Sequence, residues 1–463
     1  MVVLLALLAL SQAVPTLAQE GQPDGPVYIV KEGDSLWGIA VHFGVPLQDL
    51  QDSNGITEPS NLAPGDRLVI PGLPGVSGIL ETMEVPFGET LRSLSRRYQI
   101  TTDELARLNR LTNPEALFVG SNLILPVDRL ETKPSPKSAI QPGQSLLEYA
   151  VLNNTNPWSV MEKNGLPGSW SALPGDVLLL PGIASVGPTA LPPIIEGMSL
   201  NSLPLVQGET VVIRITSRPG IGFSGSLAGS ELRFFRDGDG YVAIQGIHAM
   251  TGPGLYPLTL KIATLTKDVA GKNVFEFSQQ VLINNADYPF DPVLTVNPET
   301  IDPSVTAPED ELWASLGETF TPKKNWDGSF QSPVPLELKD CWTSLFGSRR
   351  SFNGSPYRYF HSGLDFCGTV GTELYSAAPG KVVYTGLLTV RGNVVVIDHG
   401  WGVFTAYDHL SEILVKSGEV VRTGQVIGLG GETGRTTGPH LHWEVWVGGV
   451  QVDPTDWLEK PFP

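Results

Sequence analysis

The sequence predicts a multidomain chain built from small α+β repeats, a β-sandwich and a C-terminal, mostly antiparallel β domain. Its 463 residues exceed one ordinary core, since domains usually hold roughly 100–200 residues. Glycine (51) and proline (39) are abundant and charged residues make up only 17%, which favours β modules joined by turns over long helices. The segment 28–181 also repeats itself, with equivalent glycines at Gly33, Gly88 and Gly143.

The N-terminal segment has the pattern of a secretory signal peptide. An apolar run, Met1–Leu10, precedes small residues around Ala18 and is too short to span a bilayer comfortably. It lacks the usual basic start, and the alternatives are an uncleaved anchor or a buried first strand. We expect residues 1–19 to direct export, which leaves a secreted or wall-associated protein with no transmembrane span.

The charge balance narrows the classes of partner. The formal net charge is −18 and the sequence pI is about 4.8. Nucleic acids are bound through clustered Lys and Arg, which this chain lacks, so they are not expected partners.

Each repeat is predicted to fold as strand, helix, helix, strand. In the first, Tyr28–Val30 alternates like a strand, and Ser35 is a good N-cap for a helix whose apolar face includes Leu36 and Ile39. A second short helix ends near Asn54, and a closing strand stops at Pro71. The equivalent positions in the three repeats are Leu36, Leu91 and Leu146; Asn54, Asn109 and Asn164; Gly65, Gly120 and Gly175; and Pro71, Pro126 and Pro181.

These repeats resemble LysM domains, small βααβ modules that bind the N-acetylglucosamine-containing glycans of peptidoglycan and chitin. We place them at 27–72, 82–127 and 138–182. The third is degenerate: its first strand is nearly lost, and Asn153-Asn154 replaces the Phe43-Gly44 of the first. It is either a weaker glycan module or a spacer.

Residues 195–298 are predicted to form an antiparallel, immunoglobulin-like β-sandwich, because short alternating runs are separated by Gly, Pro and Asp turns. The segment Asp237–Gly240 favours a hairpin turn over a calcium loop, since it lacks the distal glutamate. His248, alone in this region, is read as structural. Residues 299–344 are expected to be a linker that packs on the last domain, with one or two helical turns around 312–316.

The two cysteines, Cys341 and Cys367, are predicted to form a disulfide in an exported protein. A thiolate metal ligand at Cys367 is the alternative. It is weaker because Cys341 has no neighbouring cysteine at metal-ligand spacing.

Histidines are concentrated in the last hundred residues. Alternate residues of a strand face the same way, so His440 and His442 share one face. His361 and Asp365 can converge from one bend, and one histidine of the 440/442 pair would complete the three protein ligands of a catalytic zinc site. The other histidine would then move a proton, and His409 would orient water or stabilise an oxyanion.

These motifs resemble those of the lysostaphin-type (LytM-like) zinc metallopeptidases, which cut peptide bonds in peptidoglycan. The resemblance covers about residues 345–457, and the predicted peptidase domain spans 345–459. It implies that His361, Asp365 and His442 bind zinc and that His409 and His440 are the catalytic pair. It also implies that Asn393 contacts the substrate. His399 is assigned a structural or ligand-supporting role.

The sequence therefore predicts a secreted, peptidoglycan-binding zinc metalloendopeptidase that cuts peptide crosslinks or stem peptides. The alternative is a noncatalytic wall-binding regulator that activates a cell-wall amidase. A third reading is an enzyme kept latent by its linker. Nothing in the sequence decides between glycine bridges and stem-peptide crosslinks as the bond that is cut.

Overall fold

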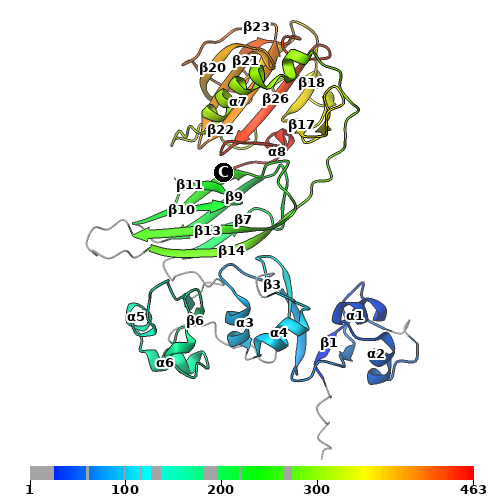
Figure 1. Cartoon of the computed structure of the whole chain (residues 1–463), viewed down its shortest axis with the longest axis vertical. Helices are drawn as coiled ribbons and strands as arrows, with labels where there is room; N and C mark the ends of the chain where they lie inside the picture. Colours follow the sequence, from blue (N-terminus) through cyan, green and yellow to red (C-terminus); the bar gives the residue numbers. More distant parts are fainter. Residues whose placement is uncertain are drawn as a thin grey trace, which may run out of the picture.

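The structure, a computed structural model, contains βααβ repeats, a central β domain and a C-terminal β domain in chain order (Figure 1). The predicted fold class is confirmed. The described residues are 25–58, 62–98, 100–113, 117–126, 137–181, 195–217, 220–264 and 274–463. The predicted signal peptide lies outside them. No helix within these ranges has the length and apolar character needed to cross a membrane.

The first two repeats share a four-stranded sheet of order β2-β1-β3-β4, in which β1 and β3 run parallel. The third has its own pair, β5 and β6. The elements are β1 (Val27–Ile29), α1 (Leu36–Phe43), α2 (Leu47–Asn54) and β2 (Arg67–Val69); β3 (Ile79–Glu84), α3 (Leu91–Tyr98), α4 (Thr102–Leu108) and β4 (Asn122–Pro126); and β5 (Lys137–Ala139), α5 (Leu146–Leu152), α6 (Pro157–Lys163) and β6 (Val177–Leu179).

An asparagine at the end of the second helix holds each repeat together. Asn54 accepts a hydrogen bond from the Val69 N–H at 2.7 Å and donates to the carbonyls of Leu50 and Val69, each at 2.8 Å. Asn109 and Asn164 make the same bonds at the same sequence spacing. One side chain thus joins helix to strand in all three repeats.

The expected near-loss of the first strand in the third repeat is wrong. Strand β5 pairs with β6 through three residue pairs, just as β1 pairs with β2. Strand pairing uses backbone groups, so it does not require side-chain alternation. Asn154 takes a φ of 53°, near the 68° of Gly44, because asparagine tolerates the left-handed region.

The second repeat contacts both of its neighbours. Arg96 on α3 pairs with Asp176 of the third repeat at 3.1 Å. On another side, the backbone N–H of Gly88 donates to Gln279 of the central domain at 2.7 Å. Phe87 and Val119 are buried in the core of that domain.

The central domain is one continuous eight-stranded sheet of order β7-β9-β12-β11-β10-β13-β14-β8, rather than two separate sheets. Strand β11 pairs with β10 through residues 230–233 and with β12 through residues 234–237, so it joins the two halves. Apolar side chains of both halves share one core, as in a sandwich. The strands are β7 (Ile195–Leu200), β8 (Leu205–Val206), β9 (Thr210–Ser217), β10 (Ile221–Leu227), β11 (Ser230–Asp237), β12 (Gly240–Gly246), β13 (Gly254–Thr264) and β14 (Val274–Asn284).

The hairpin predicted at Asp237–Gly240 is confirmed, since Asp237 pairs with Gly240 at the end of β11 and β12. Gly238 has a φ of 55°, which suits a tight turn.

The linker contains a longer helix than the sequence suggested. Helix α7 (Pro303–Gly317) has 15 residues instead of one or two turns. Asp302 caps it by accepting from the Ser304 N–H, and Pro303 starts it. Trp313 is buried against the C-terminal sheet beside Val394 and Phe404. Tertiary packing therefore extends a segment that has no clear helical period of its own.

The C-terminal domain is built on a sheet of order β15-β18-β26-β22-β21-β20-β24, with β27 paired to β26. A three-stranded sheet (β19-β25-β23) and a short pair (β16-β17) complete it. The elements are β15 (Trp342–Ser344), β16 (Arg349–Arg350), β17 (Tyr359–Phe360), β18 (Leu364–Cys367), β19 (Glu373–Tyr375), β20 (Gly380–Leu388), β21 (Gly392–Gly400), β22 (Val403–Leu410), β23 (Glu412–Ile413), β24 (Val420–Val421), β25 (Val426–Leu429), β26 (His440–Val447), β27 (Val450–Val452) and α8 (Pro454–Glu459).

The central and C-terminal domains share buried surface. Phe235 stacks on Trp401 with ring centroids 5.2 Å apart, and the Trp457 indole N–H donates to Thr210 at 3.0 Å. Val242 and Ile244 of β12 belong to the same buried cluster as the C-terminal core.

Candidate metal centre and active site

Neighbouring strands bring the predicted site residues together. Strands β18 and β22 flank β26 in the sheet (Figure 1). Asp365 on β18 lies opposite His442 on β26, and His442 in turn lies opposite Asp408 on β22. His361 stands in the bend just before β18, and His409 follows Asp408 near the end of β22.

Three predicted ligands converge on one point. His361 Nε2 lies 2.9 Å from Asp365 Oδ1 and 2.9 Å from His442 Nδ1, and His442 Nδ1 lies 2.7 Å from Asp365 Oδ1. All three side chains are buried. Two imidazoles and a carboxylate are a donor set typical of catalytic zinc, so these residues fit the ion that the sequence predicted.

The hydrogen bonds of the two histidines fix which nitrogen faces this point. His361 Nδ1 lies 2.8 Å from the Leu345 carbonyl, which can only accept, so Nδ1 carries the proton and Nε2 offers a lone pair. His442 Nε2 lies 3.2 Å from the Glu444 carboxylate, which orients Nδ1 toward Asp365 in the same way.

Glu444 is a site residue to which the sequence gave no role. It accepts hydrogen bonds from Ser362 Oγ at 2.6 Å, Trp446 Nε1 at 2.6 Å and Trp313 Nε1 at 3.0 Å. Burial alone would raise its pKa, yet the pKa lies below its ordinary value because His442 hydrogen bonds to it. Its position on the His440–His442 face was the available signal.

The predicted catalytic pair, His409 and His440, lies beside the ligands with ring centroids 4.9 Å apart. His409 Nδ1 is 2.7 Å from the Thr433 carbonyl, and His440 Nδ1 is 2.9 Å from the Gly438 carbonyl. Both Nδ1 atoms therefore carry protons, and both Nε2 atoms are acceptors. His409 has a φ of 66°, a backbone conformation that is strained for a residue with a side chain.

His409 is neutral over the physiological pH range. Burial, followed by the neighbouring His440, lowers its pKa to about 3. A neutral imidazole whose Nδ1–H is already used cannot donate to an oxyanion. The geometry thus favours orientation of water over the oxyanion role that the sequence left open.

His399 is fully buried and lies between the Pro379 carbonyl and the Thr405 hydroxyl, each 2.8 Å from a ring nitrogen. It fits the structural assignment. His248 is exposed at the rim of the site and accepts from the Met250 N–H at 3.1 Å.

Asn393 lies close to the catalytic pair. Its amide donates to the Leu410 carbonyl at 3.0 Å, and its backbone N–H donates to Thr433. It is not among the residues that line the cavity beside the ligands. Its contact with the substrate stays a prediction.

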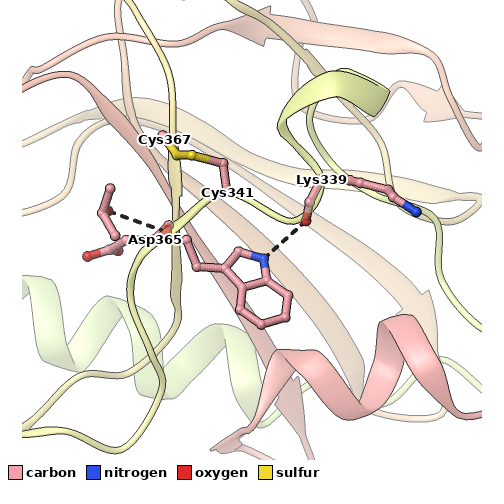
Figure 2. Close-up of a disulfide and its surroundings, with 6 residues drawn as sticks. Lys339, Cys341, Asp365 and Cys367 are labelled. Carbon is pink, nitrogen blue, oxygen red and sulfur yellow. Dashed lines mark hydrogen bonds between the residues drawn. A yellow bond between two sulfur atoms is a disulfide. The ribbon is translucent and has the colours of Figure 1, made fainter.

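Cys341 and Cys367 form a disulfide, with Cα atoms 5.6 Å apart (Figure 2). Cys367 lies opposite His440 in the β18–β26 pair. The loop before β15, which contains Cys341, is held by the Trp342 indole, which donates to the Lys339 carbonyl at 3.1 Å. The disulfide therefore ties that loop to the strand that carries Asp365.

A cavity of about 720 Å³ lies beside the ligands. Its lining includes the ligands Asp365 and His442, the catalytic pair His409 and His440, and four arginines. The linker contributes Asp310, Thr343 and Ser344 to the wall and leaves this volume open.

Comparison with known proteins agrees with this architecture. Residues 359–454 match the model of peptidase family M23, and residues 28–71 and 84–126 match the LysM domain. The chain carries a peptidase family M23 domain and two LysM domains. The third repeat lies outside the LysM matches.

Among curated relatives, the chain is 52% identical over 119 residues to the peptidoglycan DD-endopeptidase ShyA of Vibrio cholerae serotype O1, which is 26% of this chain and 28% of the relative. It is 44% identical over 103 residues to the DD-carboxypeptidase/endopeptidase Mpg of Neisseria meningitidis serogroup B, 22% of this chain and 24% of the relative. The chain thus spans about a quarter of the length of these relatives.

Two solved structures are also similar. The catalytic domain of lysostaphin from Staphylococcus simulans is 30% identical, with a TM-score of 0.21 over 29% of this chain and 92% of that one. A zinc-containing peptidase from Vibrio cholerae is 18% identical, with a TM-score of 0.27 over 94% of this chain and 99% of that one.

Proposed function

We propose that this protein is a zinc metalloendopeptidase that cuts peptide bonds in peptidoglycan crosslinks or stem peptides. The observation that carries the proposal is the convergence of His361, Asp365 and His442 beside two further histidines whose Nε2 atoms are acceptors. A noncatalytic regulator would not need this complete set. The similarity to peptidoglycan DD-endopeptidases of Vibrio cholerae supports the same reaction class.

In this mechanism His361 Nε2, Asp365 Oδ1 and His442 Nδ1 would hold the ion. Bound zinc would supply a Lewis acid that polarises the scissile carbonyl and makes water nucleophilic at neutral pH. His440 takes the proton of the attacking water at Nε2 and later passes it to the leaving amine. His409 accepts a hydrogen bond at Nε2 and so orients the same water.

Wall affinity is assigned to the LysM domains, which we propose bind the glycan strands. Modest sites in series raise the effective concentration of the peptidase domain on a polymer. We further propose that the protein acts outside the cytoplasm, at the cell wall, since its proposed substrate lies there; export by residues 1–19 stays a prediction.

The test incubates zinc-loaded protein with purified peptidoglycan and counts new amino termini. We expect release by the wild type, loss of release with chelator or in His361→Ala, and recovery of the chelated wild type on adding zinc. If peptidoglycan of both the glycine-bridged and the directly crosslinked type yields no amino termini, the peptidase function is wrong. The regulator that activates an amidase would then be favoured.

A further inference from the structure

Four arginines line the cavity beside the metal ligands: Arg350, Arg358, Arg391 and Arg435. Two of them have acidic partners within the protein. Arg350 pairs with Asp291 at 3.2 Å, and Arg391 pairs with Glu309 at 3.3 Å. These two cations are already compensated by the fold.

Arg435 differs from them. No carboxylate of the described residues pairs with it, although its side chain is half-buried. It donates one hydrogen bond, from Nη1 to the Thr300 carbonyl at 3.0 Å, and its guanidinium lies 4.4 Å over the Phe352 ring. A guanidinium has five N–H donors, so most of its capacity remains for a ligand.

The electrostatic surroundings of Arg435 favour an anion. Its pKa is lowered to about 10, first by burial and then by the like charges of Arg391 and Arg350. The Glu309 carboxylate, which pairs with Arg391, raises the pKa of Arg435 by less than these effects lower it. Burying a cation without a counter-ion costs free energy, which an anion in the cavity would recover.

The guanidinium is also held in place before any ligand arrives. The Arg435 N–H donates to the Val390 carbonyl at 2.8 Å, and the carbonyl and ring contacts hold the other end of the side chain. Arg435 belongs to the short loop that leads into β26, five positions before His440. A preorganised fork loses little entropy when it binds.

We propose that Arg435 is a specificity residue that binds a free carboxylate of the substrate peptide, with a planar, two-point contact. Arg358, exposed on the same cavity wall and without an acidic partner among the described residues, assists by its charge. Stem peptides of peptidoglycan carry free carboxylates, whereas glycine bridges are neutral along their length. The inference therefore selects carboxylate-bearing peptides as the substrate class, and it rests on the proposed peptidase function.

The experiment uses two crosslinked stem peptides that differ only in a carboxylate changed to a carboxamide. For the wild type we expect a KM at least about tenfold lower for the carboxylate peptide, because the contact is a charge-assisted hydrogen bond. In Arg435→Gln this preference disappears, because KM for the carboxylate peptide rises to that for the carboxamide peptide. Arg435→Lys keeps the charge but cannot make the planar, two-point contact, so it should retain only part of the preference.

The control is Arg422→Gln, an exposed arginine of the same domain that does not line the cavity. It should keep the full preference, and zinc content verifies the folding of each variant. Equal KM values for the two peptides with the wild type would overturn the inference and leave the peptidase function standing. An undiminished preference in Arg435→Gln would also overturn it, whereas cleavage of neither peptide would overturn both proposals.

Discussion

Glu444 connects the metal centre to the packing of the domain. Its carboxylate orients His442 on one side and accepts from two tryptophan indoles on the other. A carboxylate behind a ligating histidine fixes the tautomer and raises the basicity of the ligand.

Replacing Glu444 with Gln should therefore weaken zinc binding by roughly 10- to 100-fold, because His442 loses its charged acceptor. Competition with a chromophoric chelator measures the affinity. Trp446→Phe removes another hydrogen bond to the same carboxylate, the one from the indole N–H, and should change zinc affinity much less. Equal losses in the two variants would refute the orienting role.

His399 makes a separate, pH-dependent contribution to stability. Burial lowers its pKa from 6.5 to about 4, so the unfolded chain binds the proton more readily than the folded one. The contribution is present in full above pH 6.5 and is lost as the pH falls toward 4. Its size is roughly 3 kcal/mol for a shift of this order.

His399→Gln removes that titration. Between pH 6.5 and about 4, its free energy of unfolding should fall less steeply than that of the wild type. The difference between the two slopes should correspond to the uptake of about one proton on unfolding. Denaturant unfolding across this window measures both slopes, and the metal ligands titrate in both proteins. Parallel slopes would show that His399 does not titrate in this window.

At the residue scale, sequence patterns predicted which side chains form the site, but not the hydrogen-bond partners of those side chains. Alternation along one strand placed His440 and His442 on one face, so that one of them was expected to be a ligand. The resemblance to lysostaphin-type peptidases then implied His442, with His361 and Asp365, as the ligand set. The tautomers of these histidines depend on carbonyls such as those of Leu345 and Thr433, which any residue type supplies. The sequence therefore carries no signal for them.

Helix α7 illustrates tertiary packing at the scale of an element. Trp313 packs in a buried cluster with residues of the C-terminal sheet, and Arg391 lies 4.2 Å over its ring. Its indole also donates to Glu444. The helix thus covers one face of the sheet, and through Glu444 it also supports the metal centre.

Trp313→Ala should destabilise the C-terminal domain by about 3–5 kcal/mol, the usual range for a buried tryptophan cut to alanine. Thermal or denaturant unfolding measures the loss. Trp313→Phe keeps most of the packing but not the indole hydrogen bond, so it should cost less and still weaken zinc binding slightly. A loss under about 1 kcal/mol in the alanine variant would be far below the range for a buried tryptophan, and would mean that α7 packs only loosely on the sheet.

The disulfide between Cys341 and Cys367 closes a loop with a sequence separation of 26. Changing both cysteines to serine should lower the free energy of unfolding by about 3.5 kcal/mol in the chain-entropy account. A phosphine reductant should destabilise the wild type similarly and leave the double variant unaffected. If the reductant shifts both proteins equally, the effect does not come from this disulfide.

Some elements could be predicted from the sequence and others could not. Turn signals located the Asp237–Gly240 hairpin because few residues fit a tight turn. The full length of α7 could not be predicted, since the sheet that stabilises it lies far along the chain. Likewise, the continuity of the central sheet depends on β11 pairing with different strands along its length.

At the scale of the whole molecule, successive domains contact one another instead of being joined only by flexible linkers. The second repeat is joined to the third by Arg96 and Asp176 and to the central domain through Gly88 and Gln279. The central domain shares a buried cluster with the peptidase domain. Under the proposed function, these contacts hold the LysM domains in a fixed relation to the cleft.

Zinc content tests the central claim most directly. Elemental analysis of purified wild type should find one zinc per chain, and His361→Ala, Asp365→Ala and His442→Ala should each lose it while staying folded. His42→Ala, on helix α1 of the first repeat, should keep it. Zinc retained in all three ligand variants, or absent from wild type supplied with the ion, would contradict a catalytic zinc centre at this place.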